Sequence, residues 1–351
     1  MTSHPEFNAS TNATDVAKVF SDSIKGKSVL ITGVAPNGIG QATAHAIAAH
    51  EPSLIIISGR SKEKLDASLA SLHTSFPSVP IRELVMDLAS QKSVRAAAAQ
   101  VNAYTENIDI LINNAGVMAI PKRTLTEDGI EMQFGTNHIG HFLFTNLILP
   151  KLKAAAQSAT PGATRVINVS SWGHNFSPFR FSDYNFDGKP VPRDEAPDQA
   201  SLQLFKETGK VSEGYHPWVA YGQSKTANIL FSAYLATHLS RFGIQSFGLH
   251  PGSIMTDLGR HMTGEMNHDL EEYAANTVFK TQDQGAATTL VASFDPKLKT
   301  ESGVYLDDCQ MGEAREWATA EPAADRLWAL SEELVGQKFV LWGTNGRDWL
   351  D

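Results

Sequence analysis

The segment Val29-Leu-Ile-Thr-Gly-Val-Ala-Pro-Asn-Gly-Ile-Gly40 decides the fold of this chain. Four apolar or β-branched residues lead into a turn with glycines at 33, 38 and 40, and a helical pattern begins at Ile39. Glycines let the backbone turn tightly and approach a ligand closely, and the first turn of a helix offers unpaired N–H groups that bind anions. After a first strand, this order predicts a binding site for the pyrophosphate of a dinucleotide.

Short apolar runs and longer helical patterns alternate outward from this segment along most of the 351 residues. The predicted strands are residues 28–32, 54–58, 81–86, 108–112, 165–170, 244–250 and 303–306, and the helices include 39–50, 62–76, 91–104, 128–149 and 219–242. The strands are nearly continuous in apolar residues, as expected when helices cover both faces of a parallel sheet. We therefore predict an α/β architecture, a single doubly wound Rossmann domain with about seven parallel strands.

The domain boundaries follow from where this alternation starts and stops. Residues 1–26 are interpreted as a polar, frayed N-terminal arm, residues 27–336 as the nucleotide-binding domain, and residues 337–351 as a C-terminal tail. Inside the domain, residues 176–215 hold four prolines and seven of the chain's 24 Phe and Tyr residues. So long a connection is usually functional or disordered, and its aromatic content favours an inserted lobe over the site. An arm that packs on its own or on a partner subunit is the alternative.

Charge and cysteine content argue against several classes of protein. Lys and Arg number 29 against 38 Asp and Glu, a net charge of −9, whereas binding to nucleic acid or anionic lipid requires a basic surface. The single cysteine, Cys309, excludes an internal disulfide and the usual zinc clusters. No apolar run has the length of a membrane helix, and no signal peptide is recognisable. We expect a cytoplasmic protein without nucleic-acid or membrane partners and without a metal.

The end of the second predicted strand indicates which dinucleotide is bound. A cofactor with a free ribose 2′-hydroxyl is usually held there by Asp or Glu, whereas a 2′-phosphate calls for Arg. The strand ends in Ile57-Ser-Gly-Arg60, with Lys62 and Lys64 just beyond and no acidic residue at its end. NADP(H) is therefore favoured over NAD(H). A solvated Arg60 at the start of a helix is the alternative.

Six motifs in order identify a family. They are Thr32-Gly33 with Gly38-Ile39-Gly40, then Asn113-Asn-Ala-Gly116, Asn137, Ser170-Ser171, Tyr221-x-x-x-Lys225 and Pro251-Gly252. With them the chain resembles the short-chain dehydrogenases/reductases from about residue 27 to residue 335. Longer segments around these motifs are similar to the retinol-dehydrogenase-like branch. Two of them are Thr136-Asn-His-Ile-Gly-His-Phe-Leu-Phe144 and Leu327-Trp-Ala-Leu-Ser-Glu-Glu-Leu-Val335. The resemblance implies an NADP-dependent oxidoreductase.

Tyr221 and Lys225 make chemical sense as a pair. They are four residues apart on a predicted helix, so their side chains share one face. A tyrosine with an ordinary pKa of about 10 is a poor base near neutral pH, and lowering that pKa by about three units requires roughly 4 kcal/mol. One cation at about 4 Å supplies about that much at an effective dielectric constant of about 20. We therefore expect Lys225 to lower the pKa of Tyr221.

The resemblance also implies the roles of the remaining catalytic residues. Tyr221 would move the proton, Ser171 would hydrogen-bond the substrate oxygen, and Asn137 would hold a water that links Lys225 to solvent. Ser170 is the alternative to Ser171, and burial at a helix kink without a catalytic part is the alternative for Asn137. His138 and His141, on the same predicted helix, lack a third ligand. We interpret these two histidines as packing or interface residues.

Cofactor and substrate contacts are likewise carried over from the resemblance. Besides Tyr221 and Lys225, the expected cofactor residues are Gly33, Asn37, Gly38, Ile39, Gly40, Arg60, Asp87, Leu88, Asn114, Ala115, Gly116, Pro251, Gly252, Ile254 and Thr256. Helix capping is the alternative for Asp87. The expected substrate contacts are Met118, Trp172, His174 and Trp218.

Two departures from the family pattern matter. Four residues, not three, separate Gly33 from Gly38, and the turn signal Pro36-Asn37-Gly38 suggests that the extra residue bulges outward. The lobe also places Ser171 and Tyr221 50 positions apart, so we expect it to decide substrate choice.

The function predicted from these residues is the interconversion of a carbonyl and an alcohol on a bulky apolar or aromatic molecule. Retinoid-like, steroid-like and polyketide-like substrates all fit this prediction. An isomerase, epimerase or dehydratase on the same scaffold, or a non-catalytic NADP-binding protein, is the alternative. The family often forms dimers or tetramers, so a homodimer or homotetramer is possible.

Overall fold

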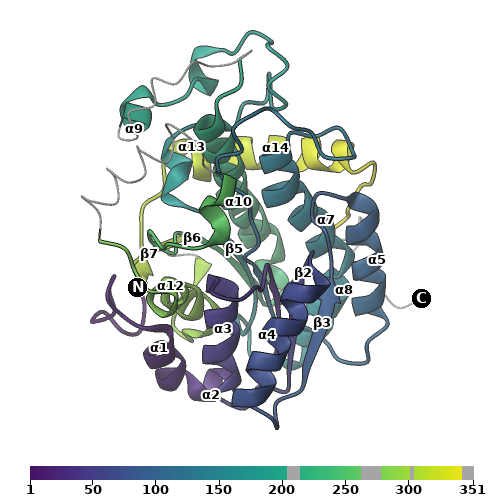
Figure 1. The fold of residues 1–351 in the computed structure, drawn as a ribbon, viewed down its shortest axis with the longest axis vertical. Helices are drawn as coiled ribbons and strands as arrows, with labels where there is room; N and C mark the ends of the chain where they lie inside the picture. The colour runs from purple at the N-terminus through teal and green to yellow at the C-terminus, as the bar shows by residue number, and fades with distance from the viewer. Residues whose placement is uncertain (204–213, 262–277, 301–303, 342–351) are drawn as a thin grey trace.

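A computed structural model describes residues 1–203, 214–261, 278–300 and 304–341. Its sheet has eight strands in the order β3-β2-β1-β4-β5-β6-β7-β8, and every neighbouring pair is parallel except β7 and β8 (Figure 1). The strands are β1 (Ser28–Thr32), β2 (Leu54–Gly59), β3 (Ile81–Val85), β4 (Ile110–Asn113), β5 (Thr164–Val169), β6 (Ile244–Leu249), β7 (Tyr305–Asp307) and β8 (Gln310–Met311). The predicted Rossmann sheet is confirmed, with a two-residue antiparallel edge strand added.

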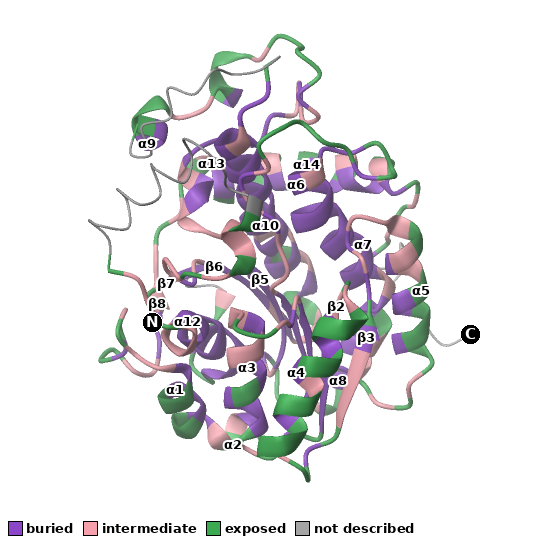
Figure 2. Ribbon diagram, in the orientation of Figure 1, coloured by how far each residue is buried: buried purple, intermediate pink, exposed green. Residues whose placement is uncertain are grey.

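Helices cover both faces of this sheet. One layer holds α3 (Ile39–Ala48), α4 (Lys62–Ser75) and α12 (Gln282–Phe294); the other holds α5 (Gln91–Asn102), α7 (Gly140–Leu147), α8 (Leu149–Ser158), α10 (Pro217–Leu239) and α14 (Glu321–Leu334). Because side chains alternate across a strand, Val29 and Ile31 of β1 pack in the first layer and Leu30 in the second. Figure 2 shows the buried residues gathered along the sheet between the two helical layers.

The N-terminal residues do not form the frayed arm that we expected. They form two short helices: α1 (Ala13–Val19) lies beside α3 and α12, and α2 (Ser21–Ile24) follows it. Val16, Ala17 and Phe20 are buried in the same apolar cluster as β1, and Phe20 also contacts the ring of Phe7. Apolar residues at helical spacing within a polar stretch therefore extend the core.

The inserted lobe packs against the start of α10. Phe176, Phe186 and Tyr215 form a buried cluster together with Trp218 and Tyr221 of that helix. The turn η2 (Trp172–Asn175) leads into the lobe, η3 (Arg193–Glu195) and α9 (Gln199–Gln203) lie within it, and Phe205 lies outside the described residues. Two further elements lie outside the lobe: the turn η5 (Asp257–His261) after β6, and α13 (Glu316–Thr319) before α14.

No helix in the described ranges is long and apolar enough to cross a membrane.

Candidate active site

Two adjoining pockets open at the carboxyl ends of the parallel strands, where ligands bind in doubly wound folds. The glycine-loop pocket lies between the β1–α3 turn, the ends of β2 and β3, and the segment after β6. The tyrosine pocket lies between Ser171, Tyr221, the lobe and that same segment. The two pockets share Ile39, Asn114, Gly116, Thr256 and Leu258. They are therefore two halves of one cleft.

The glycine loop forms a cradle that larger residues would fill. Gly33 has φ +73°, and a Cβ on it would lie 2.5 Å from the Cα of Ala115. A Cβ on Gly40 would lie 2.8 Å from Nδ2 of Asn114. Gly38 lines the pocket directly before α3. The glycines thus let the loop pack closely against the residues that follow β4. The N-terminus of α3 stays open to an anion, which fits the predicted pyrophosphate.

The extra residue of this loop lies outside the pocket. Asn37 has φ +61°, a left-handed conformation that asparagine tolerates, and its side chain is exposed. The outward bulge predicted from Pro36-Asn37-Gly38 is therefore present. Asn37 itself does not line the glycine-loop pocket, which is formed here by Val34, Ala35 and Pro36. The predicted cofactor contact of Asn37 has no support in this geometry.

Asn137 lies on a π-helical turn, where one continuous helix over residues 128–149 had been predicted. The structure instead has α6 (Met132–Phe134), the π turn (Gly135–Ile139) and then α7. The Asn137 side chain donates to the Val117 carbonyl and to Ser224 Oγ, both at 2.9 Å, and accepts from the Val117 N–H at 2.8 Å. It therefore fastens the loop after β4 to α10. The water relay through Asn137 stays a prediction.

His141 connects Asn137 to the end of β1. Thr32 Oγ1 accepts hydrogen bonds from the N–H groups of Asn114 and Ala115, each at 3.0 Å, so its own proton points to His141 Nε2 at 2.8 Å. Nδ1 of the ring then carries the proton and donates to the Asn137 carbonyl at 2.9 Å. Burial lowers the pKa of His141 to about 4, which agrees with this neutral ring. His141 thus packs inside the protein, as expected, and joins Thr32 to Asn137 through two hydrogen bonds.

His138 has a separate partner on the far side of the helix. Its Nε2 lies 2.9 Å from Oγ of Ser331 in α14, and its ring stacks on Phe134. Burial lowers the pKa of His138 to about 3. Within the described residues, no group of three or more His, Cys, Asp or Glu side chains could hold a metal ion.

Tyr221 lies on α10, buried against Gly173 and the lobe, and hydrogen-bonds Ser171. Ser171 Oγ also accepts from the Gly173 N–H at 3.0 Å, which holds the serine at the strand end. Ser170 has a different task, because its hydroxyl donates to the Lys225 carbonyl at 2.7 Å. This geometry favours Ser171 as the partner of a substrate oxygen.

In this structure burial, rather than Lys225, dominates the pKa of Tyr221. Burial raises the pKa of Tyr221 to about 12, and the hydrogen bond with Ser171 only partly opposes that rise. Burial also lowers the pKa of Lys225 to about 7, so the lysine carries only part of its charge at neutral pH. Its Nζ donates to the Val169 carbonyl at 3.0 Å and lies 5.6 Å from the centre of the Tyr221 ring. Tyr221 is therefore a protonated phenol, suited to donate a proton.

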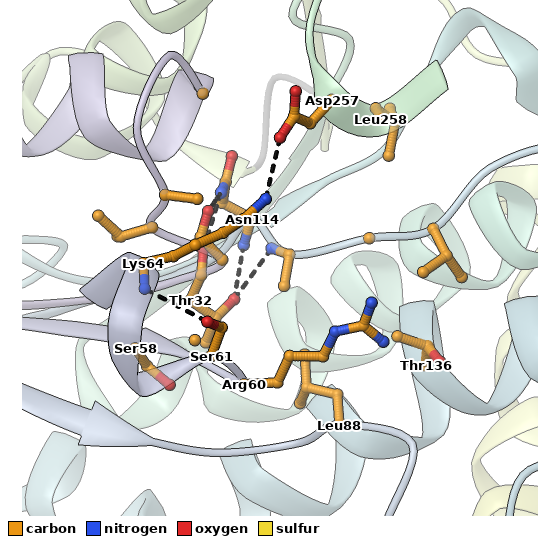
Figure 3. Close-up of a pocket in the computed structure, with 18 of the residues that line it drawn as sticks. Thr32, Ser58, Arg60, Ser61, Lys64, Leu88, Asn114, Thr136, Asp257 and Leu258 are labelled. Atoms are coloured by element: carbon orange, nitrogen blue, oxygen red, sulfur yellow. Dashed lines mark hydrogen bonds and ion pairs between the residues drawn. The ribbon is translucent and has the colours of Figure 1, made fainter. Parts of the chain in front are cut away.

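Basic residues gather at the other end of the cleft. Arg60, Ser61 and Lys64, from the end of β2 and the start of α4, line the glycine-loop pocket together with Asp87 and Leu88 (Figure 3). The Asp87 carboxylate also accepts from the Ala89 N–H at 3.0 Å, so Asp87 caps this turn, while Ser90 caps α5. The structure thus brings the residues predicted for the adenosine half of the cofactor to one place.

The segment after β6 carries residues that the sequence did not single out. Asp257 and Arg260 reach the glycine-loop pocket from η5. The predicted cofactor residues Pro251, Gly252, Ile254 and Thr256 line the tyrosine pocket, and Thr256 lines both pockets. A loop without a recognisable motif gives no spacing from which Arg260 could have been identified.

Three of the four predicted substrate residues line the tyrosine pocket. These are Met118, Trp172 and Trp218, and Phe176, His250 and Phe279 were missed. His174 was a wrong prediction. Its ring is buried away from the pocket, with Nδ1 on the Ser171 carbonyl at 2.7 Å and Nε2 accepting from the Arg315 N–H at 3.3 Å.

Comparisons with known proteins agree with this geometry. The family model for short chain dehydrogenases matches residues 27–185. The oxidoreductase fscI of Fusarium equiseti is 41% identical over 70% of this chain and 94% of its own length. Retinol dehydrogenase 13 of Homo sapiens is 38% identical over 89% of this chain and 86% of its own length.

Solved structures share the fold. An uncharacterized protein from Mycobacterium Paratuberculosis has a TM-score of 0.62 at 30% identity, covering 90% of this chain and 96% of its own. An NADPH-bound carbonyl reductase from chicken fatty liver has a TM-score of 0.57 at 22% identity, covering 83% and 99%.

Proposed function

Because the chain belongs to the short-chain dehydrogenase/reductase family, in its retinol-dehydrogenase-like branch, we propose that it reduces the carbonyl group of a bulky apolar substrate with NADPH. The observation that carries this proposal is the hydrogen-bonded pair of Ser171 and Tyr221 where the two pockets adjoin. One pocket suits a dinucleotide and the other suits an apolar molecule. The reacting groups would meet beside a phenol that can give a proton.

Described residues of this chain line the proposed cofactor site. Gly33, Gly38 and the N-terminus of α3 would hold the pyrophosphate, and Ile254 and Thr256 would lie beside the nicotinamide. Bound there, the cofactor supplies the hydride that reduces the carbonyl carbon. Arg60 supports NADP(H) over NAD(H), because a guanidinium matches a phosphate and not a ribose hydroxyl.

The proton comes from Tyr221. As negative charge develops on the carbonyl oxygen, the Tyr221 hydroxyl donates its proton and Ser171 holds the same oxygen in place. The phenolate left behind is stabilised by the charged form of Lys225 below it on α10. Oxidation of an alcohol would run the same steps in reverse, with Tyr221 accepting the proton.

The walls of the tyrosine pocket favour a bulky apolar or aromatic substrate. Its apolar lining comes from Met118, Trp172, Phe176 and Trp218, three of them large aromatic residues. Such rings bury a large area of an apolar ligand. The similarity to retinol dehydrogenases supports a retinoid-like molecule among the candidates, beside steroid-like and polyketide-like carbonyls.

The test is turnover of a panel of aromatic and polycyclic ketones and aldehydes with NADPH. We expect loss of NADPH absorbance with at least one of them, and we expect Tyr221→Phe to abolish it while cofactor binding, followed by fluorescence, stays intact. Turnover that survives in Tyr221→Phe would contradict the proposed mechanism. Conversion of a substrate without loss of NADPH would favour an isomerase or dehydratase instead.

A further inference from the structure

Two guanidinium groups reach the glycine-loop pocket from opposite walls. Arg60 extends from the end of β2 on the side of Leu88 and Thr136, and Asp257 marks the facing wall (Figure 3). Arg260 lines the pocket from this facing wall, on the same turn of η5 as Asp257. The two walls are 200 positions apart in sequence at these residues. No spacing along the sequence relates Arg60 to Arg260, but the fold brings both residues to one pocket.

A polar clasp fixes the facing wall to the β2 side of the cleft. Nζ of Lys64, in the first turn of α4, lies 3.0 Å from Oδ2 of Asp257. Arg260 then donates from Nη1 to the Asp257 carbonyl at 2.8 Å. The ion pair is exposed, so its own contribution to stability is small. Its geometric effect is to hold Arg260 over the pocket that Arg60 also lines.

The charges at this end of the cleft are unbalanced. Among the residues that the structure describes, no carboxylate lies within ion-pair distance of either Arg60 or Arg260. Burial and the nearby positive charge of Arg60 both lower the pKa of Arg260, and the negative charge of Asp257 partly opposes them. Two like charges that face one pocket repel each other, and an anion bound between them relieves that repulsion. A negatively charged group therefore suits the space between the two guanidiniums.

We propose that Arg60 and Arg260 bind the ribose 2′-phosphate of NADP(H) from two sides, with Lys64 and Asp257 positioning Arg260. The inference rests on the proposed function, because it concerns the same cofactor. The pyrophosphate has its own place at the N-terminus of α3, whereas Arg60 lies on the side of Ser61 and Leu88, at the adenosine end, and Arg260 lines the same pocket. Thr256 and Leu258 of the same segment line both pockets, so binding of the phosphate also fixes one wall of the substrate pocket.

The test uses calorimetric titration of the full chain with two probes, adenosine 2′,5′-bisphosphate and adenosine 5′-monophosphate. They differ only in the 2′-phosphate. A charge-assisted hydrogen bond accounts for about a tenfold difference in affinity or more. We expect Arg260→Ala and Arg60→Ala each to weaken binding of the bisphosphate by about tenfold or more, and binding of the monophosphate by less than about twofold.

Arg193→Ala is the matched control, because Arg193 is an exposed residue of the lobe that lines neither pocket. It should change neither affinity, which separates local binding from an effect of net charge. Equal weakening of both probes in Arg260→Ala, or no weakening of either, would overturn the inference. If Arg60→Ala alone loses the preference for the bisphosphate, the proposed function stands and the role of Arg260 falls. If the wild-type protein binds the bisphosphate no better than the monophosphate, both the role of Arg260 and the proposed preference for NADP(H) are contradicted.

Discussion

Tyr221 shows how the surroundings of a single residue set its protonation state. Its burial raises the pKa of the phenol to about 12, and the hydrogen bond with Ser171 does not reverse that rise. The sequence motif identified the pair Tyr221 and Lys225 but could not reveal this burial, because the lobe that covers the tyrosine lies elsewhere in the chain. A protonated Tyr221 donates a proton, as carbonyl reduction requires.

Ser171 and Ser170 provide a direct comparison between adjacent hydroxyls. Ser171 hydrogen-bonds Tyr221, whereas Ser170 donates to the Lys225 carbonyl. We expect Ser171→Ala to lower kcat by about 10²–10³, the effect of losing one donor to a developing oxyanion. Ser170→Ala should lower kcat far less. Steady-state kinetics on both variants check this, and an equal loss in both would contradict the assignment.

The pKa of Lys225 predicts how reduction depends on pH. Because burial lowers this pKa to about 7, the lysine is charged below that pH and neutral above it. The charged form stabilises the phenolate that Tyr221 becomes, so kcat/KM for reduction should fall as pH rises through about 7. A profile of kcat/KM against pH measures this. A value that rises over the same interval would contradict the role of Lys225.

At the scale of elements, the strands were predictable and the helix that carries Asn137 was not. Predicted strand 28–32 coincides with β1, since a run buried on both faces leaves a clear pattern. Predicted helix 128–149 contains a π turn at 135–139, flanked by Gly135 and Gly140, where an added Cβ would meet Thr126 and Leu88. These contacts join residues that are distant in sequence, so the hydrophobic periodicity of the segment does not predict them.

Gly140 at the start of α7 is the sharpest test of that close approach. A Cβ there would lie 2.4 Å from the Leu88 carbonyl oxygen, which belongs to backbone. We expect Gly140→Ala to lower the free energy of unfolding by about 1–3 kcal/mol, as overpacking does. It should also weaken NADPH binding, because Leu88 lines the glycine-loop pocket. Denaturant unfolding and cofactor titration measure the two effects, and an unchanged variant would contradict the packing.

At the scale of the whole molecule, residues far apart in sequence complete both the core and the site. The N-terminal helices extend the core on α3 and α12, and η5 closes the glycine-loop pocket from beyond β6. The sequence predicted the sheet and the residues at its strand ends. It missed the packing of Phe20, because its helical spacing with Val16 and Ala17 lies within a polar stretch. It missed the position of Arg260, because that residue belongs to no motif.

The N-terminal packing can be tested by two neighbouring substitutions. Phe20 is 5% exposed and Val19, the residue before it, is 47% exposed. We expect Phe20→Ala to lower the free energy of unfolding by about 3–5 kcal/mol, the usual result for a buried Phe. Val19→Ala should change it by less than about 0.5 kcal/mol. Equal effects in denaturant unfolding would mean that residues 1–26 are the frayed arm of the original prediction.

The central claim is that hydride passes from NADPH to a carbonyl carbon beside Tyr221. The most direct measurement uses NADPH carrying deuterium at nicotinamide C4, with the best carbonyl from the panel and mass spectrometry of the product. We expect an alcohol with one deuterium on the former carbonyl carbon and an equal amount of NADP⁺. An unlabelled product formed while NADPH is conserved would contradict it.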